Sequence, residues 1–532
     1  MVQGTGIRDL ARDESQEETL LEGDTSSIVV RRCSVTPAML IGALGALLVL
    51  GALQVCVLQS RTLAPPSPAL RGEVSEFSVG GQALEVQRLI RQKGLTGVNL
   101  GGWLCMEDWL NSGKNGSEVA TINPKGQGQC LPPLLKNVPS WASEGQLVKR
   151  LVDTAGSEFA IEAISKYRDG FVSTQDLDEI AALGLKWVRV PLSWVAFADA
   201  LKHYYPEVYG KHDPDSDAVV LPDPYYKDEI AFVTMPRDTL KSLIIEAQKR
   251  GLKVIIDLHN APGGSQRGTY NGIWPLEPVF WKARSKMEPA VPLTTLGKLI
   301  VQEMINWVES LPPNLYSGVA GLCVMNEPGH MNAIQTPYAD EKVILDWLHG
   351  ATELYRKSSL PRNGVKLYVS LIETAFKDFD NTAIQWFWKT FSVEERRTWV
   401  VAEAHYYMAW DGTCDGTTKF GTGAYQCGSA ASKGIASGCA HGAARNLRDR
   451  WGADTQIAVN EFSMATFANS KLACKDRASL MLMLSSELDA FQQQGFQTSF
   501  WTWTTPNAKE FQAGWSLKWL MGLEEVGQCG AA

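Results

Sequence analysis

The chain has 532 residues, of which 45% are hydrophobic and 20% are charged, and it carries a formal net charge of −8. This composition is typical of a folded protein, and the acidic balance argues against a nucleic-acid-binding protein, which would present a basic face. The 18 tryptophans are many for a chain of this length. We expect most of them in the core, although flat indole faces also suit the apolar faces of sugar rings.

The N-terminal segment predicts attachment to a membrane. Residues 1–35 are largely polar and predict a disordered cytoplasmic tail. The uncharged run from Pro37 to Leu58 has the length that crosses a bilayer core, about 20 residues, and exceeds the roughly 7–15 residues of a signal peptide's apolar region. We therefore predict a transmembrane signal anchor over 36–58, with a cleaved signal peptide as the alternative.

Charge and cysteine usage predict on which side of the membrane the body lies. Arg31 and Arg32 precede the anchor, which favours a cytoplasmic N-terminus under the positive-inside rule. A glycosylation sequon at Asn115 and eight cysteines beyond the anchor suit the extracellular space or the secretory-pathway lumen. We expect a single-pass type II membrane protein with a stalk over 59–92 and a catalytic domain over 93–532.

One structural unit recurs along the body: an amphipathic helix, a glycine and a short apolar run. Ser173 or Thr174 can cap the first helix and Asp238 the second, and a third begins near Leu480. The three helices end at Gly184, Gly251 and Gly495. These start and stop signals are typical of helices that alternate with buried strands.

Eight apolar runs predict the strands of the fold: 97–100, 187–191, 253–258, 321–326, 367–372, 398–404, 456–460 and 497–503. Near-continuous apolar runs suit parallel strands that are buried on both faces. Eight of them, separated by helix-length segments, predict an α/β fold, a (β/α)8 TIM barrel, preceded by the single transmembrane helix. A doubly wound sheet is the alternative, but no glycine-rich phosphate fingerprint follows the first run. The stretches 110–165, 198–236 and 408–445 are expected to be irregular.

Polar and aromatic residues stand at the ends of these runs, on the face where such barrels carry their active sites. They are Asn99, Arg189, His259, Asn326, Glu327, Glu373, His405, Tyr407, Asn460, Glu461, Trp501 and Trp503. Any one of them could be a strand end that merely touches solvent. Their coincidence at a single rim predicts the functional site there.

Glu327 and Glu461, from the fourth and seventh strands, would face each other across the mouth of the barrel. Cleavage of a glycosidic bond needs such a pair, one carboxylic acid to protonate the leaving oxygen and one carboxylate to attack the anomeric carbon. The acid must be neutral at rest, while the nucleophile stays ionised near donors such as Arg189, His405 and Tyr407. The pair therefore predicts a glycosidase.

A set of motifs in chain order carries a family resemblance. They are Gly97-Val-Asn-Leu-Gly-Gly-Trp-Leu, Val188-Arg-Val-Pro, Ile256-Asp-Leu-His-Asn-Ala-Pro-Gly-Gly-Ser-Gln266, Met325-Asn-Glu-Pro328, His405-Tyr-Tyr407, Asn460-Glu-Phe-Ser463 and Phe500-Trp-Thr-Trp503. Together they resemble glycoside hydrolase family 5 and, more narrowly, its exo-1,3-β-glucanase (glucan 1,3-β-glucosidase) branch. The resemblance runs from about residue 95 to residue 529.

The resemblance implies a retaining mechanism with Glu327 as acid/base and Glu461 as nucleophile. It also implies which residues line the subsite of the cleaved sugar: Arg189, His259, Asn326, His405, Tyr407 and a tryptophan of the last strand, Trp501 or Trp503. Glu107 matches the acidic residue that holds the non-reducing terminal sugar in this branch. Its neighbours Cys105-Met-Glu-Asp-Trp109 depart from the branch, which leaves exo specificity open.

Cysteine pairing is also implied by the resemblance, because the branch pairs late cysteines. Cys439 with Cys474, and Cys414 or Cys427 with Cys529, are the expected disulfides. Cys323 is different, since it lies inside a predicted core strand and predicts a buried free thiol.

No cofactor or metal is expected. The histidines and cysteines show no zinc spacing. The segment 213–217 resembles the start of a calcium loop, but Ala218 stands where a glycine is needed and Pro224 where the bidentate glutamate belongs. This segment therefore predicts a solvated turn.

The sequence as a whole predicts a retaining β-glycosidase that hydrolyses β-1,3-glucan, acting from the non-reducing end. Three alternatives stay open. A transglycosylase would pass the same glycosyl intermediate to another sugar, with Phe376, Trp410 or Trp515 as acceptor platforms. A hydrolase could instead act on a 1,6- or 1,4-linked glucan or a glucosyl lipid. A non-catalytic glycan-binding receptor is the last alternative, although both acids are present.

Overall fold

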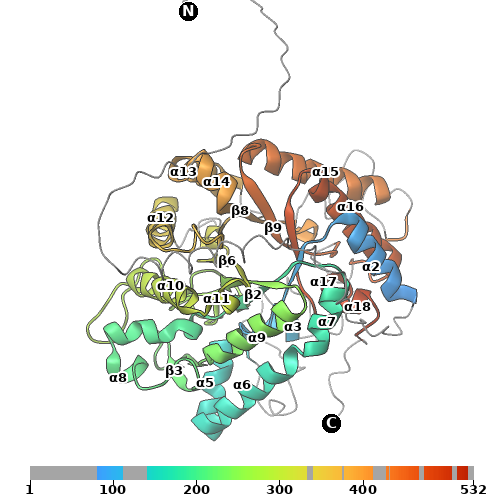
Figure 1. Ribbon diagram of the computed structural model, residues 1–532. Coiled ribbons are helices and arrows are strands. Elements are labelled where there is room, and N and C mark those ends of the chain that lie inside the picture. Colours follow the sequence, from blue (N-terminus) through green and yellow to red (C-terminus); the bar gives the residue numbers. More distant parts are fainter. Residues whose placement is uncertain are drawn as a thin grey trace, which may run out of the picture. The chain divides into compact units, whose positions relative to one another are not determined.

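The computed structural model describes residues 81–111, 141–331, 339–373, 377–410, 427–429, 432–466, 473–505 and 512–524. The chain divides into two units, Met1–Glu76 and Phe77–Ala532, and all described residues belong to the second unit (Figure 1). The predicted tail, the membrane anchor, the sequon and most of the stalk lie outside the described residues. Within the described part of the chain, no helix has both the length and the apolar character needed to cross a bilayer.

Parallel strands form a closed barrel with the order β1-β10-β9-β8-β7-β6-β5-β2. Their bounds are β1 (Gly97–Asn99), β2 (Trp187–Leu192), β5 (Lys253–Leu258), β6 (Val319–Cys323), β7 (Lys366–Glu373), β8 (Val400–His405), β9 (Gln456–Phe462) and β10 (Gln497–Phe500). Each predicted strand overlaps one of these, so the predicted (β/α)8 barrel is confirmed. A separate antiparallel pair is formed by β3 (Val220–Pro222) and β4 (Ala231–Val233).

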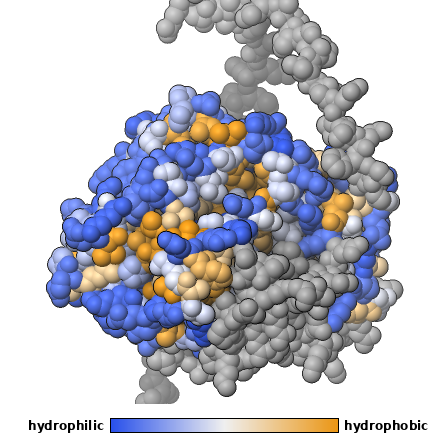
Figure 2. Space-filling model, turned by 90° about the horizontal axis from the view of Figure 1, so that it is seen from below, coloured by the Kyte–Doolittle hydropathy of each residue, from blue (hydrophilic) through white to orange (hydrophobic). Residues whose placement is uncertain are grey.

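Helices surround the barrel (Figure 1): α7 (Thr174–Ala182), α9 (Arg237–Lys249), α10 (Leu293–Ser310), α12 (Glu341–Lys357), α13 (Lys377–Thr390), α15 (Ser432–Trp451) and α16 (Arg477–Gln493). Helix α7 begins as predicted, with a capping box between Ser173 and Asp176. Helix α9 begins earlier than predicted, because Pro236 stands at its N-cap and Asp238 lies in the first turn. In Figure 2 the coloured part of the surface is hydrophilic around its edge, with apolar residues gathered near its middle.

The stretches predicted to be irregular contain several helices. The first contains α5 (Glu144–Ala155) and α6 (Ser157–Phe171), the second contains α8 (Pro206–Tyr209) and the hairpin β3–β4, and α15 begins inside the third. Helices α5 and α6 pack with β4 around a small core of their own. Polar residues interrupt their apolar pattern for a physical reason: Glu144 and Arg168 form a buried ion pair at 3.0 Å within this unit.

The folded body starts before the predicted domain boundary at residue 93. Residues Gly81–Lys93, mostly assigned to the stalk, form helix α2. Its apolar face (Ala83, Val86 and Ile90) is buried in the main core, and Lys93 forms an ion pair with Asp489 of α16. This helix is therefore part of the folded body.

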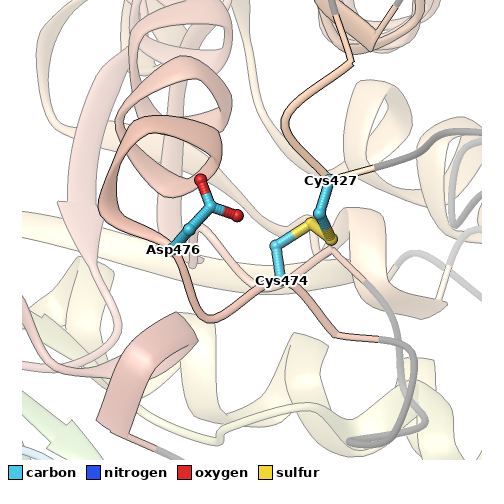
Figure 3. A group of neighbouring side chains, drawn as sticks. All are labelled: Cys427, Cys474 and Asp476. Carbon is cyan, nitrogen blue, oxygen red and sulfur yellow. A yellow bond between two sulfur atoms is a disulfide. The ribbon is translucent and has the colours of Figure 1, made fainter.

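The disulfides differ from the pairing that the resemblance implied. Cys427 is bonded to Cys474, as Figure 3 shows, so neither Cys439–Cys474 nor Cys427–Cys529 forms. Cys439 is also disulfide-bonded. Pairing depends on the approach of two Cα atoms, here 5.4 Å apart, and spacing along the chain does not determine it. Cys414 and Cys529 lie outside the described residues.

Two other sequence predictions are confirmed in the described part of the chain. Cys323 is a buried free thiol, and so is Cys105. The segment 213–217 is an exposed turn in which the acidic side chain of Asp213 accepts hydrogen bonds from Asp215 and Ser216.

Candidate active site

Side chains fill the barrel in layers, because alternate residues of each strand point inward. The lowest layer is apolar and consists of Ile255, Cys323, Tyr368, Val401 and Ala458. Two residues further along β5 and β8 stand Asp257 and Glu403, both fully buried. Another two residues further stand the rim histidines, His259 directly after the end of β5 and His405 at the end of β8. The site is therefore built on a charged layer that lies on an apolar floor.

Arg189 of β2 occupies the centre of the charged layer with none of its side chain exposed. Its Nη1 donates to Oε1 of Glu461 at 2.6 Å and to Asn99 at 3.0 Å. Its Nη2 donates to Glu403 and to Asn326, each at 3.0 Å, and also lies 3.2 Å from Asp257. One planar guanidinium thus connects side chains from several strands with one another, just below the rim of the barrel.

The charges of this layer stabilise one another. Burial alone would lower the pKa of Arg189, but the carboxylates of Asp257, Glu403 and Glu461 outweigh it and raise this pKa well above its ordinary value. Burial raises the pKa of Asp257 and of Glu403, but Arg189, together with His259 beside Asp257 and His405 beside Glu403, lowers each pKa below its ordinary value. Buried charges persist only when they are paired in this way.

Asp257 and Glu403 were not singled out from the sequence. A signal for them was present, since Asp257 precedes His259 by two residues and Glu403 precedes His405 by two. This period of two places each acid on the same inward face of its strand as the histidine.

A register shift brings Glu461 into the site. Strand β9 pairs with β8 in order up to Ala404 and Val459, and then His405 pairs with Glu461. A bulge of this kind re-aims side chains at the rim of a barrel. As a result two consecutive residues face the interior: Asn460 donates to Glu403 at 3.0 Å, and Glu461 accepts from the Tyr407 hydroxyl at 2.8 Å.

Glu327 is held by an uncommon backbone conformation. It follows β6 with φ of 41°, in the left-handed region that a residue with a side chain seldom adopts. Its backbone N–H donates to the Ser370 hydroxyl at 3.2 Å. Oε1 of Glu327 lies 2.7 Å from Nδ1 of His405, and Oε2 lies 3.2 Å from Nε2 of His330. The strained backbone thus aims this carboxyl group between two histidines.

The two predicted catalytic carboxyl groups lie close together. One carboxylate oxygen of Glu327, one of Glu461 and a ring nitrogen of His405 are all within 4.8 Å of one another. This spacing would fit a metal ion, but the positive charge of Arg189 already lies 2.6 Å from Glu461. Cys427, Cys474 and Asp476 also cluster, yet their sulfurs are joined in a disulfide and offer no thiolate ligand (Figure 3). We therefore assign the first group as a carboxyl pair.

Protonation of the pair in the free site differs from the expected order. Burial raises the pKa of Glu461, and the neighbouring Glu327 charge adds to this against His405 and Arg189. Burial also raises the pKa of Glu327, but His330 and His405 outweigh it and hold that pKa below its ordinary range. The residue expected to be the neutral acid is thus the one whose surroundings favour its ionised form.

Another wall of the site contains His259, Trp501 and Glu107. The rings of His259 and Trp501 are stacked, with centroids 5.7 Å apart and an interplanar angle of 8°. Oε1 of Glu107 lies 3.9 Å from Nε2 of His259, whose Nδ1 is 2.6 Å from Asp257. A side chain at Gly101 would place its Cβ 2.7 Å from the Trp501 ring, which explains the glycine there.

Trp503 does not join this group, contrary to the prediction. It is fully buried, and its indole N–H donates to Asp176 of helix α7 at 2.8 Å. Of the two tryptophans that the last strand offered, only Trp501 stacks in the site. The period of two along β10 could not decide between them, because 501 and 503 lie beyond its end at Phe500.

The loop that carries Glu107 is braced from outside the barrel. The backbone N–H of Met106 donates to Oε2 of Glu144 at 2.9 Å, and Arg168 pairs with the other oxygen of this carboxylate. Arg168 also donates to the carbonyl oxygens of Val233 and Thr234. This buried connection was missed from the sequence because helices α5 and α6 were expected to be irregular.

Comparison with known proteins agrees with this geometry. No family model matches the chain. It is 27% identical to a glucan 1,3-beta-glucosidase of Blumeria graminis over 218 residues, 40% of this chain and 38% of that protein. It is 26% identical to a probable glucan 1,3-beta-glucosidase A of Aspergillus niger over 247 residues, 46% of this chain and 45% of that protein. Over these matched parts the chain is similar to fungal glucan 1,3-beta-glucosidases. It spans less than half the length of these relatives.

Solved structures agree on the fold. A rutinosidase from Aspergillus niger has a TM-score of 0.52 and 16% identity over 81% of this chain and 97% of that chain. The structure named AoRut has a TM-score of 0.51 and 15% identity over 80% of this chain and 95% of that chain. At these identities the likeness concerns the barrel alone.

Replacing the central guanidinium tests the charged layer. Arg189→Met should lower the free energy of unfolding by about 3–5 kcal/mol, because it leaves buried carboxylates unpaired. Asp257 and Glu403 have lowered pKa values, and a lowered carboxyl pKa stabilises the fold above the unfolded-state pKa and ceases to do so as pH falls. The loss should therefore stay large above about pH 5 and shrink only as pH falls below about 4, where the wild-type carboxylates become protonated, as measured by urea unfolding.

The matched control is Arg168→Met, which removes a buried arginine that pairs with a single carboxylate, Glu144. Burial already raises the pKa of Glu144, so this variant should show a weaker dependence on pH. Equal pH dependence for the two variants would contradict the role assigned to Arg189.

Proposed function

We propose that the chain is a retaining β-glycosidase that hydrolyses β-1,3-glucan from its non-reducing end. The observation that carries this proposal is the approach of Glu327 and Glu461, whose carboxylate oxygens come within 4.8 Å. Retaining glycosidases hold their two carboxyl groups about 5–5.5 Å apart, whereas inverting enzymes need about 6.5–9.5 Å to fit a water molecule. The spacing supports double displacement.

Glu461 has the surroundings of a nucleophile. Arg189 donates to one of its oxygens at 2.6 Å and Tyr407 to the other at 2.8 Å, which orients the carboxylate toward the barrel mouth. Burial raises the pKa of Tyr407 well above its ordinary value, so its hydroxyl keeps the proton it donates. Attack of a Glu461 oxygen on the anomeric carbon forms the glycosyl-enzyme bond.

Glu327 completes both halves of the reaction. In the first half its proton passes to the glycosidic oxygen as the bond between that oxygen and the anomeric carbon breaks. In the second half the Glu327 carboxylate takes a proton from water, whose oxygen attacks the anomeric carbon and displaces Glu461. Two inversions at this carbon return the β configuration.

The wall formed by Glu107, His259 and Trp501 supports recognition of a terminal sugar. Glu107 is buried and offers carboxylate oxygens beside His259, while the Trp501 face closes that side. Arg189 holds the amide oxygen of Asn326, which leaves its NH2 group to donate to a sugar 2-hydroxyl. Similarity to fungal glucan 1,3-beta-glucosidases supports the β-1,3 linkage.

Transglycosylation is a second candidate because of one contact. Trp515 packs against Tyr407 with ring centroids 5.2 Å apart, so an aromatic side chain lies next to the nucleophile's hydrogen-bond donor. Adding laminari-oligosaccharides at high concentration distinguishes the two reactions, since a transglycosylase would lengthen them and a hydrolase would not.

Product analysis tests the proposed reaction. Wild-type protein should release β-glucose as the first small product of laminarin, detected by proton NMR before mutarotation. Glu461→Gln and Glu327→Gln should each lower kcat by at least about 100-fold, because each removes one carboxyl role. Asp340→Asn, at the N-cap of α12, is the control for an acidic change outside the site. Release of α-glucose would contradict the retaining mechanism, and longer first products would contradict exo action.

We also propose that the chain is a type II membrane protein whose body lies in the secretory-pathway lumen or outside the cell. The support is the sequence of residues 36–58 and the sequon at Asn115. Expressed in a eukaryotic cell, the full chain should stay in the membrane after carbonate extraction and lose apparent mass on glycosidase treatment. Asn115→Gln should abolish that mass change. Extraction of the unmodified chain by carbonate would contradict the anchor.

A further inference from the structure

His330 contacts the Glu327 carboxyl group, although it does not stand at the end of any predicted strand. It lies in the short helix η4 (Pro328–Met331), and its Nε2 is 3.2 Å from Oε2 of Glu327. Its backbone N–H also donates to the Glu327 carbonyl oxygen at 3.3 Å. The ring is 24% exposed, whereas His405, on the other oxygen of the same carboxyl group, is 1% exposed. His330 is therefore the more accessible histidine of the two.

Tyr270 holds the other nitrogen of this ring. Its hydroxyl lies 2.9 Å from Nδ1 of His330. Tyr270 is itself fixed at the backbone, where its carbonyl oxygen accepts from Asn260 at 3.2 Å and from the Cys105 thiol at 3.4 Å. A chain of contacts thus runs from Tyr270 through the His330 ring to Oε2 of Glu327.

We propose that His330 is a positioning residue for the acid/base. It fixes Oε2 of Glu327 and stores the proton that this carboxyl group delivers. The inference rests on the proposed function, in which Glu327 is the acid/base.

The proton balance of this arrangement closes over one turnover. At rest the proton is on Nε2 of His330 and Glu327 is a carboxylate. Transfer from Nε2 to Oε2 gives neutral histidine and a carboxylic acid, and the acid then protonates the leaving oxygen. In the second half Glu327 takes a proton from water and returns it to His330. No oxidant, reductant or further reactant is needed.

The charges around Glu327 favour His330 over His405 for this role. Four side chains face the Glu327 carboxyl group: His330, Tyr270, His405 and Glu461. Both ring nitrogens of His405 have carboxylate partners, Glu327 at 2.7 Å and Glu403 at 2.9 Å. Burial would lower the pKa of His405, but Glu461 and these two carboxylates raise it well above its ordinary value, so His405 keeps its proton.

The test compares a substrate whose leaving group must be protonated with one whose leaving group departs without a proton. His330→Phe keeps a ring of similar size but removes the nitrogens. It should lower kcat/KM for laminaribiose by about 100-fold and leave kcat/KM for 2,4-dinitrophenyl β-glucoside within about threefold, because dinitrophenolate leaves without a proton. For the activated substrate kcat and KM should fall together, since base catalysis of the second half is also impaired. Azide, which needs no base, should restore that kcat.

Tyr270→Phe is the second variant and should show the same split with a smaller loss, about tenfold on laminaribiose, because it keeps the His330 ring and removes only the hydrogen bonds of the Tyr270 hydroxyl to His330 and to Glu327. His203→Gln changes an exposed histidine of η2 (Trp194–His203) and is the control. Equal losses of kcat/KM on both substrates, or no loss on either, would overturn the role of His330. Wild-type protein that cleaves neither substrate would instead contradict the proposed function.

Discussion

The buried guanidinium of Arg189 is the interaction on which the site depends. It connects the first strand, through Asn99, to acids and amides that arise far apart in the sequence: Asp257, Asn326, Glu403 and Glu461. Each buried carboxylate would be costly without it, and the guanidinium would be costly without them. The fold and the site thus depend on the same contacts, since Arg189 joins side chains from β1, β5, β8 and β9.

The charge of this layer explains how two acidic groups can lie close together at the rim. Glu461 approaches Glu327 because Arg189 and Tyr407 hold its oxygens, while histidines hold the oxygens of Glu327. In the free site, positive charge is concentrated around Glu327, the residue that must become the acid. These surroundings favour its ionised form. A partly exposed histidine beside that residue provides both the charge and the proton.

The sequence predicted most of the barrel because its strands are buried on both faces and read as apolar runs, and it predicted the rim because polar residues interrupt those runs at their ends.

Prediction from the sequence failed where the outcome depends on which residues approach one another in three dimensions. The cysteine partners and the orientation of Trp503 depend on loops, and His330 enters the site through a turn after Glu327 rather than through a strand. The alternation of side chains along a strand could have identified Asp257 and Glu403, which precede the rim histidines by two residues. They were overlooked because each lies within a predicted apolar run. The Glu144–Arg168 brace was missed because buried ionic residues disguise the apolar faces of α5 and α6.

The measurement that tests the central claim most directly is trapping of the glycosyl-enzyme intermediate. The protein would be incubated with 2,4-dinitrophenyl 2-deoxy-2-fluoro-β-glucoside, whose fluorine slows the second half of the reaction, and then digested for peptide mass mapping. The account predicts one added fluoroglucosyl group, attached to the peptide that contains Glu461. Attachment to Glu327, or turnover without any covalent adduct, would contradict the assignment of the two carboxyl groups.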